Sequence, residues 1–99
     1  MFRKEGKMVI TLKTGKKVDL QITPLLLEYV KKYEGGIDQL KIDIENPEKQ
    51  IQAVNYMLYS VVASNYGNDK LSKRQILKLI DIRDMQRIAD FVVDSLIKK

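Results

Sequence analysis

Residues 50–68 contain no charged side chain, although 31% of the residues in this 99-residue chain are charged. The run includes the stretch AVNYMLYSVVA, and its length approaches the ~20 apolar residues that a membrane-spanning helix requires. Polar residues break it into apolar pieces too short for a span: Gln50, Gln52, Asn55, Ser60, Ser64, Asn65 and Asn68. The run therefore predicts a helix that the rest of a small fold encloses.

Apolar side chains lie around most of the circumference of this predicted helix. The stripe expected to face the core consists of Ile51, Val54, Leu58, Val61 and Val62. The remaining sides of the helix also carry apolar residues, namely Ala53, Tyr56, Met57 and Tyr59. A helix that is apolar nearly all round is usually surrounded. Two interpretations stay open: the helix is the centre of the fold, or one side of it meets another protein, because tyrosine and methionine suit interfaces.

The chain contains neither cysteine nor histidine. Disulfides, zinc thiolate sites and thiol nucleophiles are therefore excluded, and the commonest general base and metal ligand is missing. Carboxylates and arginines interleave near the end of the chain at the spacing of ordinary helical ion pairs: Asp81, Arg83, Asp84, Arg87, Asp90 and Asp94. We therefore expect no enzyme activity, no catalytic residue, no metal and no cofactor.

The length of the chain suffices for one domain with a single modest core, which we expect to occupy residues 1–99. The N-terminus lacks the cationic stretch and following apolar segment of a secretory leader. We expect a cytosolic protein without a membrane insertion.

Residues 8–22 alternate between apolar and polar side chains on both sides of a glycine-containing turn, which predicts an N-terminal β-hairpin. The register that aligns the apolar faces pairs Leu12 with Val18, Ile10 with Leu20 and Met8 with Ile22. This register leaves a loop centred on Thr14, Gly15 and Lys16, where glycine can adopt a positive φ. An isolated hairpin is marginal in water, so its apolar face must cover helices.

Capping signals predict helices in the remainder of the chain, residues 24–97. Thr23-Pro24 and Gly35-Gly36 bracket a first helix of about ten residues, and a short helix follows near residues 37–45. Asn46-Pro47 opens the uncharged helix, which runs to about Asn65, and a capping box at Ser72 and Gln75 precedes two further segments that meet near Asp81. The expected fold class is mainly α with a short N-terminal β-hairpin (α+β), a small bundle of about four helices.

The net charge of +5 resides entirely in residues 1–17, which carry six basic residues and one acidic residue. The other eighty-two residues carry twelve of each. Lysines of the hairpin could contact phosphates, and residues 71–88 can be written as a helix-turn-helix. A helix that reads base edges would present its arginines without acidic neighbours. In this chain Asp84 and Asp90 stand beside Arg83 and Arg87. Nucleic-acid binding is therefore an alternative that the sequence does not favour.

The hairpin MVITLKTGKKVDLQI passes directly into TPLLLEYVKKYEGG and then into a small helical body. This organisation resembles the tail assembly chaperones of long-tailed bacteriophages, particularly those of Gram-positive hosts. The resemblance covers the whole chain in organisation and is recognisable residue by residue from Met8 to Tyr33. It implies a non-catalytic protein of the host cytoplasm that keeps the long, helical tape measure protein soluble until tail tube subunits polymerise around it. The tape measure protein and the tail tube protein are the partners that the resemblance implies.

The family has no catalytic motif that could be transferred to this chain, so the predicted partner-binding residues come from the sequence pattern. They are the apolar residues that the core stripes do not use: Leu25, Tyr29, Tyr56 and Tyr59. Two alternatives remain beside the chaperone interpretation. One is a small basic DNA-binding or regulatory protein, and the other is a structural protein that forms a homo-oligomer through the uncharged helix.

Overall fold

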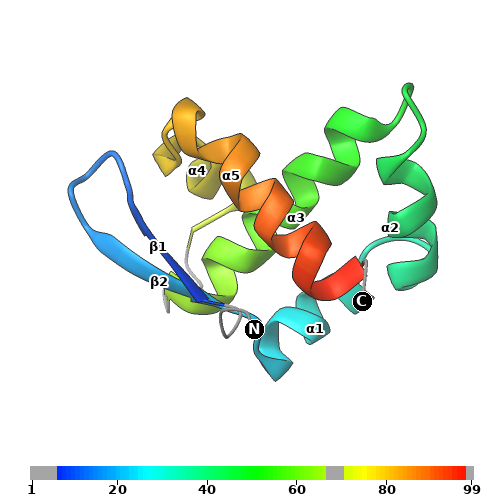
Figure 1. Cartoon of the computed structure of the whole chain (residues 1–99), viewed down its shortest axis with the longest axis horizontal. Coiled ribbons are helices and arrows are strands. Elements are labelled where there is room, and N and C mark those ends of the chain that lie inside the picture. Colours follow the sequence, from blue (N-terminus) through cyan, green and yellow to red (C-terminus); the bar gives the residue numbers. More distant parts are fainter. Residues whose placement is uncertain (1–6, 67–70, 98–99) are drawn as a thin grey trace, which may run out of the picture.

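The computed structural model of the chain describes residues 7–66 and 71–97. Within them, a two-stranded antiparallel hairpin precedes five α-helices and a short π-helical turn. The uncharged helix, α3 (Gln50–Tyr66), runs through the middle of the molecule, and the hairpin and the other four α-helices all pack on it (Figure 1). The expected fold class is confirmed, with one more helix than the four predicted.

The hairpin consists of β1 (Lys7–Thr11) and β2 (Lys17–Gln21). The predicted register is wrong by two residues, because Ile10 pairs with Val18 and Met8 pairs with Leu20. A tighter loop causes the shift: the Leu12 N–H donates to the Lys16 carbonyl over 2.8 Å, and Gly15 adopts a φ of 95°. A slip of two residues leaves each side chain on its predicted face, so the apolar face is buried as expected.

Helix α1 (Pro24–Lys31) begins where the sequence predicts, since the Thr23 hydroxyl accepts a hydrogen bond from the Leu26 N–H over 3.2 Å. It ends two residues before Tyr33. Gly35, with a φ of 93°, turns the chain into α2 (Gly36–Ile44). The two helices pack against each other and against α3. The glycine pair therefore starts the second helix, as its position predicts, but the first helix ends at Lys31, four residues before Gly35 and earlier than expected.

Helix α3 begins at Gln50, later than the predicted start after Asn46. Pro47, Glu48 and Lys49 form a turn, and the Asn46 side-chain oxygen accepts a hydrogen bond from the Glu48 N–H over 3.0 Å. The asparagine thus caps the turn that leads into the helix.

The predicted core stripe of α3 is correct at Leu58, Val61 and Val62, which are buried. It is wrong at Ile51 in the first turn, which is 76% exposed, and it leaves out Met57, six residues further on, which is fully buried. The neighbouring elements enclose the opposite side of that turn, where Ala53 lies. Apolar character alone does not distinguish these two sides, since both carry apolar residues.

Two short helices complete the chain, α4 (Lys73–Leu79) and α5 (Ile82–Val92), and η1 (Val93–Ile97) extends α5 as a π-helical turn. The capping box of α4 is present: Ser72 and Gln75 each accept a hydrogen bond from the other's backbone N–H. Asp81 separates the two helices and caps α5 by accepting from the Arg83 N–H. Within residues 7–66 and 71–97, no helix has the length and apolar content needed to cross a bilayer.

Candidate functional site

Three of the four predicted partner-binding residues meet where α1 packs on α3. The Tyr29 and Tyr59 ring centroids lie 5.7 Å apart, and those of Tyr56 and Tyr59 lie 5.8 Å apart, both in edge-to-face geometry. Leu25 stands one turn before Tyr29 on α1, and its side chain is 51% exposed. We call the set Leu25, Tyr29, Tyr56 and Tyr59 the tyrosine ledge.

The tyrosines of the ledge are half-buried and differ in how firmly they are held. The Tyr56 hydroxyl donates to the Tyr29 carbonyl over 2.7 Å, and its ring also packs on Tyr33 with centroids 5.1 Å apart. Tyr56 therefore joins α1 to α3 as well as facing the surface. Burial raises the pKa of both the Tyr56 and the Tyr59 hydroxyl, so both stay neutral at physiological pH. The ledge is an aromatic surface with an exposed aliphatic residue at one end, and the Lys73 ammonium lies over its Tyr56 ring, 5.8 Å from the centroid.

A buried polar cluster lies behind the ledge. The Asp43 carboxylate, on α2, accepts hydrogen bonds from the Tyr33 hydroxyl over 2.5 Å and from the Gln39 side-chain amide over 2.8 Å. The hydrogen bond from Tyr33 holds the pKa of Asp43 below its ordinary value, although only 3% of this residue is exposed. Burial, and next the hydrogen bond to Asp43, raises the pKa of Tyr33 to about 12.

This cluster borders an open polar hollow of about 320 Å³ whose rim includes Glu34, Lys49 and Gln52. Asp43 was not predicted as a buried residue, because a single aspartate in a weakly amphipathic helix resembles a solvent-facing residue. The spacing of ten residues between Tyr33 and Asp43 carries no helical or strand signal. We interpret the cluster as a structural tie between the end of α1 and α2.

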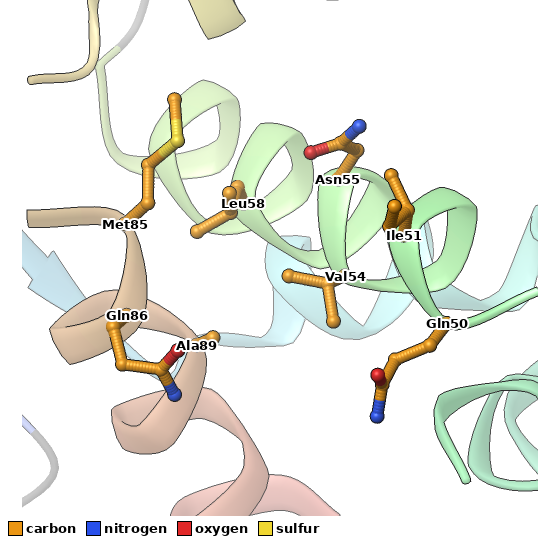
Figure 2. Close-up of a pocket in the computed structure, with 8 residues that line it drawn as sticks. All are labelled: Gln50, Ile51, Val54, Asn55, Leu58, Met85, Gln86 and Ala89. Carbon is orange, nitrogen blue, oxygen red and sulfur yellow. The ribbon is translucent and has the colours of Figure 1, made fainter. Parts of the chain in front are cut away.

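A second surface, which the sequence pattern did not reveal, lies between α3 and α5 (Figure 2). It is a hollow of about 310 Å³ with an apolar lining from both helices: Ile51, Val54, Leu58, Met85 and Ala89. Figure 2 shows Val54 and Leu58 extending from α3 toward Ala89 of α5. The polar side chains on its edge are the amides Gln50, Asn55 and Gln86. We call this surface the α3/α5 groove.

One ion pair of α5 has the helical spacing that the sequence predicts, since Arg87 contacts Asp84, three residues before it, at 2.9 Å. Arg83 instead contacts the N-cap residue Asp81, two residues before it, at 3.0 Å, and Asp90 accepts a hydrogen bond from Gln86. Pairs on such exposed arginines contribute little to stability, and they occupy the basic groups that a DNA-reading helix would present. In the part of the chain that the structure describes, no three acidic side chains gather as metal ligands would.

Comparison of the chain with protein-family models, with curated proteins and with solved structures gave no match.

Proposed function

We propose that this chain is a non-catalytic assembly chaperone that binds a long, helix-rich protein, and that its client is the tape measure protein of a long-tailed phage or prophage. The observation that carries the proposal is the tyrosine ledge, a cluster of aromatic edges beside a 51% exposed leucine. Apolar side chains that cluster on a surface, as Leu25 does with Tyr29 one turn further along α1, mark a site that another protein covers, whereas a single exposed residue does not. On this proposal the protein acts in the host cytoplasm.

A helical client fits the chemistry of the ledge. Leu25 and Tyr29 lie four residues apart on α1, and Tyr59 packs against Tyr29 from α3. The surface is therefore a shallow step between two helices, on which an apolar stripe of a third helix can lie. Tyrosine adds a neutral hydroxyl that can bond to polar groups beside such a stripe.

The organisation of the chain supports the choice of client. An N-terminal hairpin leads directly into a helical body, as in the tail assembly chaperones that the sequence resembles. A tape measure protein is long and helical, so it exposes apolar stripes until the tail tube encloses it. A chaperone for such a client needs an apolar binding surface and no reactive group. The tail tube protein, which displaces the chaperone on this scheme, is the second partner.

The test is co-expression of the chain with the tape measure protein of the same tail gene cluster, with measurement of the soluble fraction of the client. We expect the wild-type chain to keep the client soluble and to co-purify with it after nuclease treatment. The double variant Leu25→Ser, Tyr59→Ala removes the exposed ends of the ledge and is expected to lose the client. The control Ile42→Ser changes an apolar residue that is 60% exposed on α2 and lies outside the ledge, and it should behave as wild type.

Two results would contradict the proposal. An insoluble client in the presence of wild-type chain would remove the chaperone role. Retention of the client by the ledge variant, with loss in Ile42→Ser, would place binding on another surface. Recovery of DNA that disappears after nuclease treatment would instead favour the basic hairpin as the functional element.

A further inference from the structure

The α3/α5 groove combines a protruding apolar side chain with a hollow that could receive one. Ile51 stands on its edge with 76% of its surface exposed, while Leu58 and Ala89 form a buried floor. The hollow, about 310 Å³, is at the small end of ligand-sized cavities and suits one or two side chains. The protruding side chain of Ile51 and the hollow therefore belong to the same surface patch of one molecule.

A patch of this kind is complementary to itself. In a two-fold symmetric dimer the same surface of both copies meets, so each feature must match its counterpart across the axis. We propose that the groove is the interface of a homodimer, in which Ile51 of each copy inserts into the groove of the other, between α3 and Met85 of α5. This inference does not depend on the proposed client.

The polar groups of the groove fit a second copy better than a partner of fixed charge. None of its eight lining residues is charged. Near a two-fold axis a charged residue faces its own copy and is repelled, whereas an amide both donates and accepts and can pair with itself. Gln50 and Gln86 already donate within the chain, to the Ile44 carbonyl and to Asp90. Asn55 is the amide we expect to bond across the axis.

The distribution of charge in the chain permits such a dimer. The net charge of +5 resides in residues 1–17, and β2 rests on the far end of α3, where the Asn65 side chain donates to the Gln21 carbonyl. Ile51 and Asn65 are fourteen residues apart on one helix, which corresponds to roughly 20 Å. The strands of the hairpin therefore lie toward the end of α3 that is remote from Ile51 (Figure 1), whereas the loop reaches the end of α4, just before α5, where the Lys13 N–H donates to the Leu79 carbonyl over 2.8 Å. The lysines of this loop are exposed to solvent, so salt screens their repulsion across a dimer beyond roughly 10 Å.

The size of the molecule sets how strong this contact can be. A specific interface takes roughly 800 Å² from each partner, out of a total accessible surface of 6576 Å² here. The groove with its edges supplies a compact patch on two helices. We therefore expect a reversible dimer whose population depends on protein concentration.

The first test is sedimentation velocity of the full chain without any client, over a range of concentrations from micromolar to millimolar. The wild-type protein is expected to shift reversibly from monomer to dimer. Ile51→Ser should raise the dissociation constant of the dimer by at least about tenfold, because each dimer loses the burial of two isoleucines. Ile42→Ser, which changes an exposed isoleucine of α2, is the matched control and should dimerise as wild type. Thermal melts of both variants verify that the fold is retained.

A second measurement locates the contact directly. In a mixed sample, with one population labelled at isoleucine methyls and the other at methionine methyls, an intermolecular NOE between Ile51 and Met85 is expected. The Ile42 methyl should give none.

Several outcomes overturn the proposal. A wild-type chain that stays monomeric throughout, a particle larger than a dimer, or unchanged dimerisation of Ile51→Ser would each do so. A monomer whose Ile51 resonance shifts only when the tape measure protein is added would assign the groove to the client. Because no client is present in the sedimentation test, its failure leaves the role of the tyrosine ledge untouched.

Discussion

The Tyr33 hydroxyl donates a hydrogen bond of 2.5 Å to the carboxylate of Asp43, a residue that is only 3% exposed. The contact joins Tyr33, two residues beyond the end of α1, to the last turn of α2, and Gln39 supplies a second donor to the same carboxylate. A buried carboxylate is tolerated when such donors replace its hydration. The Tyr33 ring also packs edge-to-face on Tyr56 of α3. Tyr33 therefore joins the segment after α1 to both α2 and α3 behind the tyrosine ledge.

Tyr33→Phe should destabilise the fold, because it keeps the ring and removes a donor to a buried charge. We expect the free energy of unfolding to fall by roughly 1–3 kcal/mol, measured by urea denaturation at neutral pH. Tyr59→Phe, a half-buried ring that keeps its stacking in the variant, is the control and should change stability by less than about 0.5 kcal/mol. Equal losses of stability in the two variants would show that the hydrogen bond from Tyr33 to Asp43 does not contribute measurably to the free energy of unfolding.

Stability should decline at alkaline pH because of Tyr33. Its pKa is raised to about 12 in the folded chain, from an ordinary value of about 10. Between these values the unfolded chain has released the proton that the folded chain retains, so the free energy of unfolding falls as pH rises. The contribution is fully present below pH 10 and is lost as pH approaches 12.

The measurement for this alkaline effect is an absorbance titration of the tyrosinates, accompanied by denaturant melts at each pH. One tyrosine should titrate near pH 12 in the wild-type chain, and that step should be missing in Tyr33→Phe. A variant with an unchanged final step would assign the late titration to another tyrosine.

Gly35→Ala should cost more stability than Gly15→Ala. Both glycines have a positive φ, of 93° and 95°, which costs a residue with a side chain roughly 1–2 kcal/mol. A Cβ at Gly15 meets nothing within 4 Å, whereas a Cβ at Gly35 would lie 2.5 Å from the Cβ of Gln39. Displacement of Gln39 would also disturb its hydrogen bond to Asp43. Thermal melts of the two variants give the comparison, and a larger loss for Gly15→Ala would contradict it.

Most of the fold follows from local signals in the sequence. The Thr23-Pro24 cap, the Gly35-Gly36 turn and the Ser72 capping box each act over a few residues, so the pattern of residues locates them. The register of the hairpin was wrong because face alternation has a period of two residues and is satisfied equally well after a shift of two. The geometry of the loop at Gly15, which fixes the register, has no signature in the apolar pattern.

The surfaces depend on packing between distant elements, and they were predicted less completely. Tyr29, Tyr56 and Tyr59 were selected because the core stripes did not use them, and the structure does bring them together. The α3/α5 groove was missed because Ile51 was assigned to the core. Which side of an all-round apolar helix is covered depends on where its neighbours cross, and this information is not local.

Substitutions on the two sides of the first turns of α3 should differ accordingly. Met57 is fully buried, so Met57→Ala should cost about 2–5 kcal/mol through lost burial and the cavity left behind. Ile51→Ala removes a 76% exposed side chain and should cost less than about 0.5 kcal/mol in dilute, monomeric protein. Urea melts at low protein concentration measure both. The reverse order would mean that Ile51, as its apolar character suggests, belongs to the core.

Loss of the Ser72 cap should lower the free energy of unfolding more than loss of the Asn46 cap. Ser72→Ala removes the hydroxyl that accepts from the Gln75 N–H at the start of α4, and should lower the free energy of unfolding by about 1 kcal/mol. Asn46→Ala was expected from the sequence to cost the same, as the N-cap of the uncharged helix. In the structure Asn46 caps the turn before Gln50, where its side chain accepts from Glu48. The helix proper begins beyond that bond, so its loss should cost less than the loss of the Ser72 cap. Thermal melts of Ser72→Ala and Asn46→Ala test this order, with Arg74→Ala, at an exposed position of α4, as the control. An Asn46 effect equal to that of Ser72 would restore the helix start predicted from the sequence.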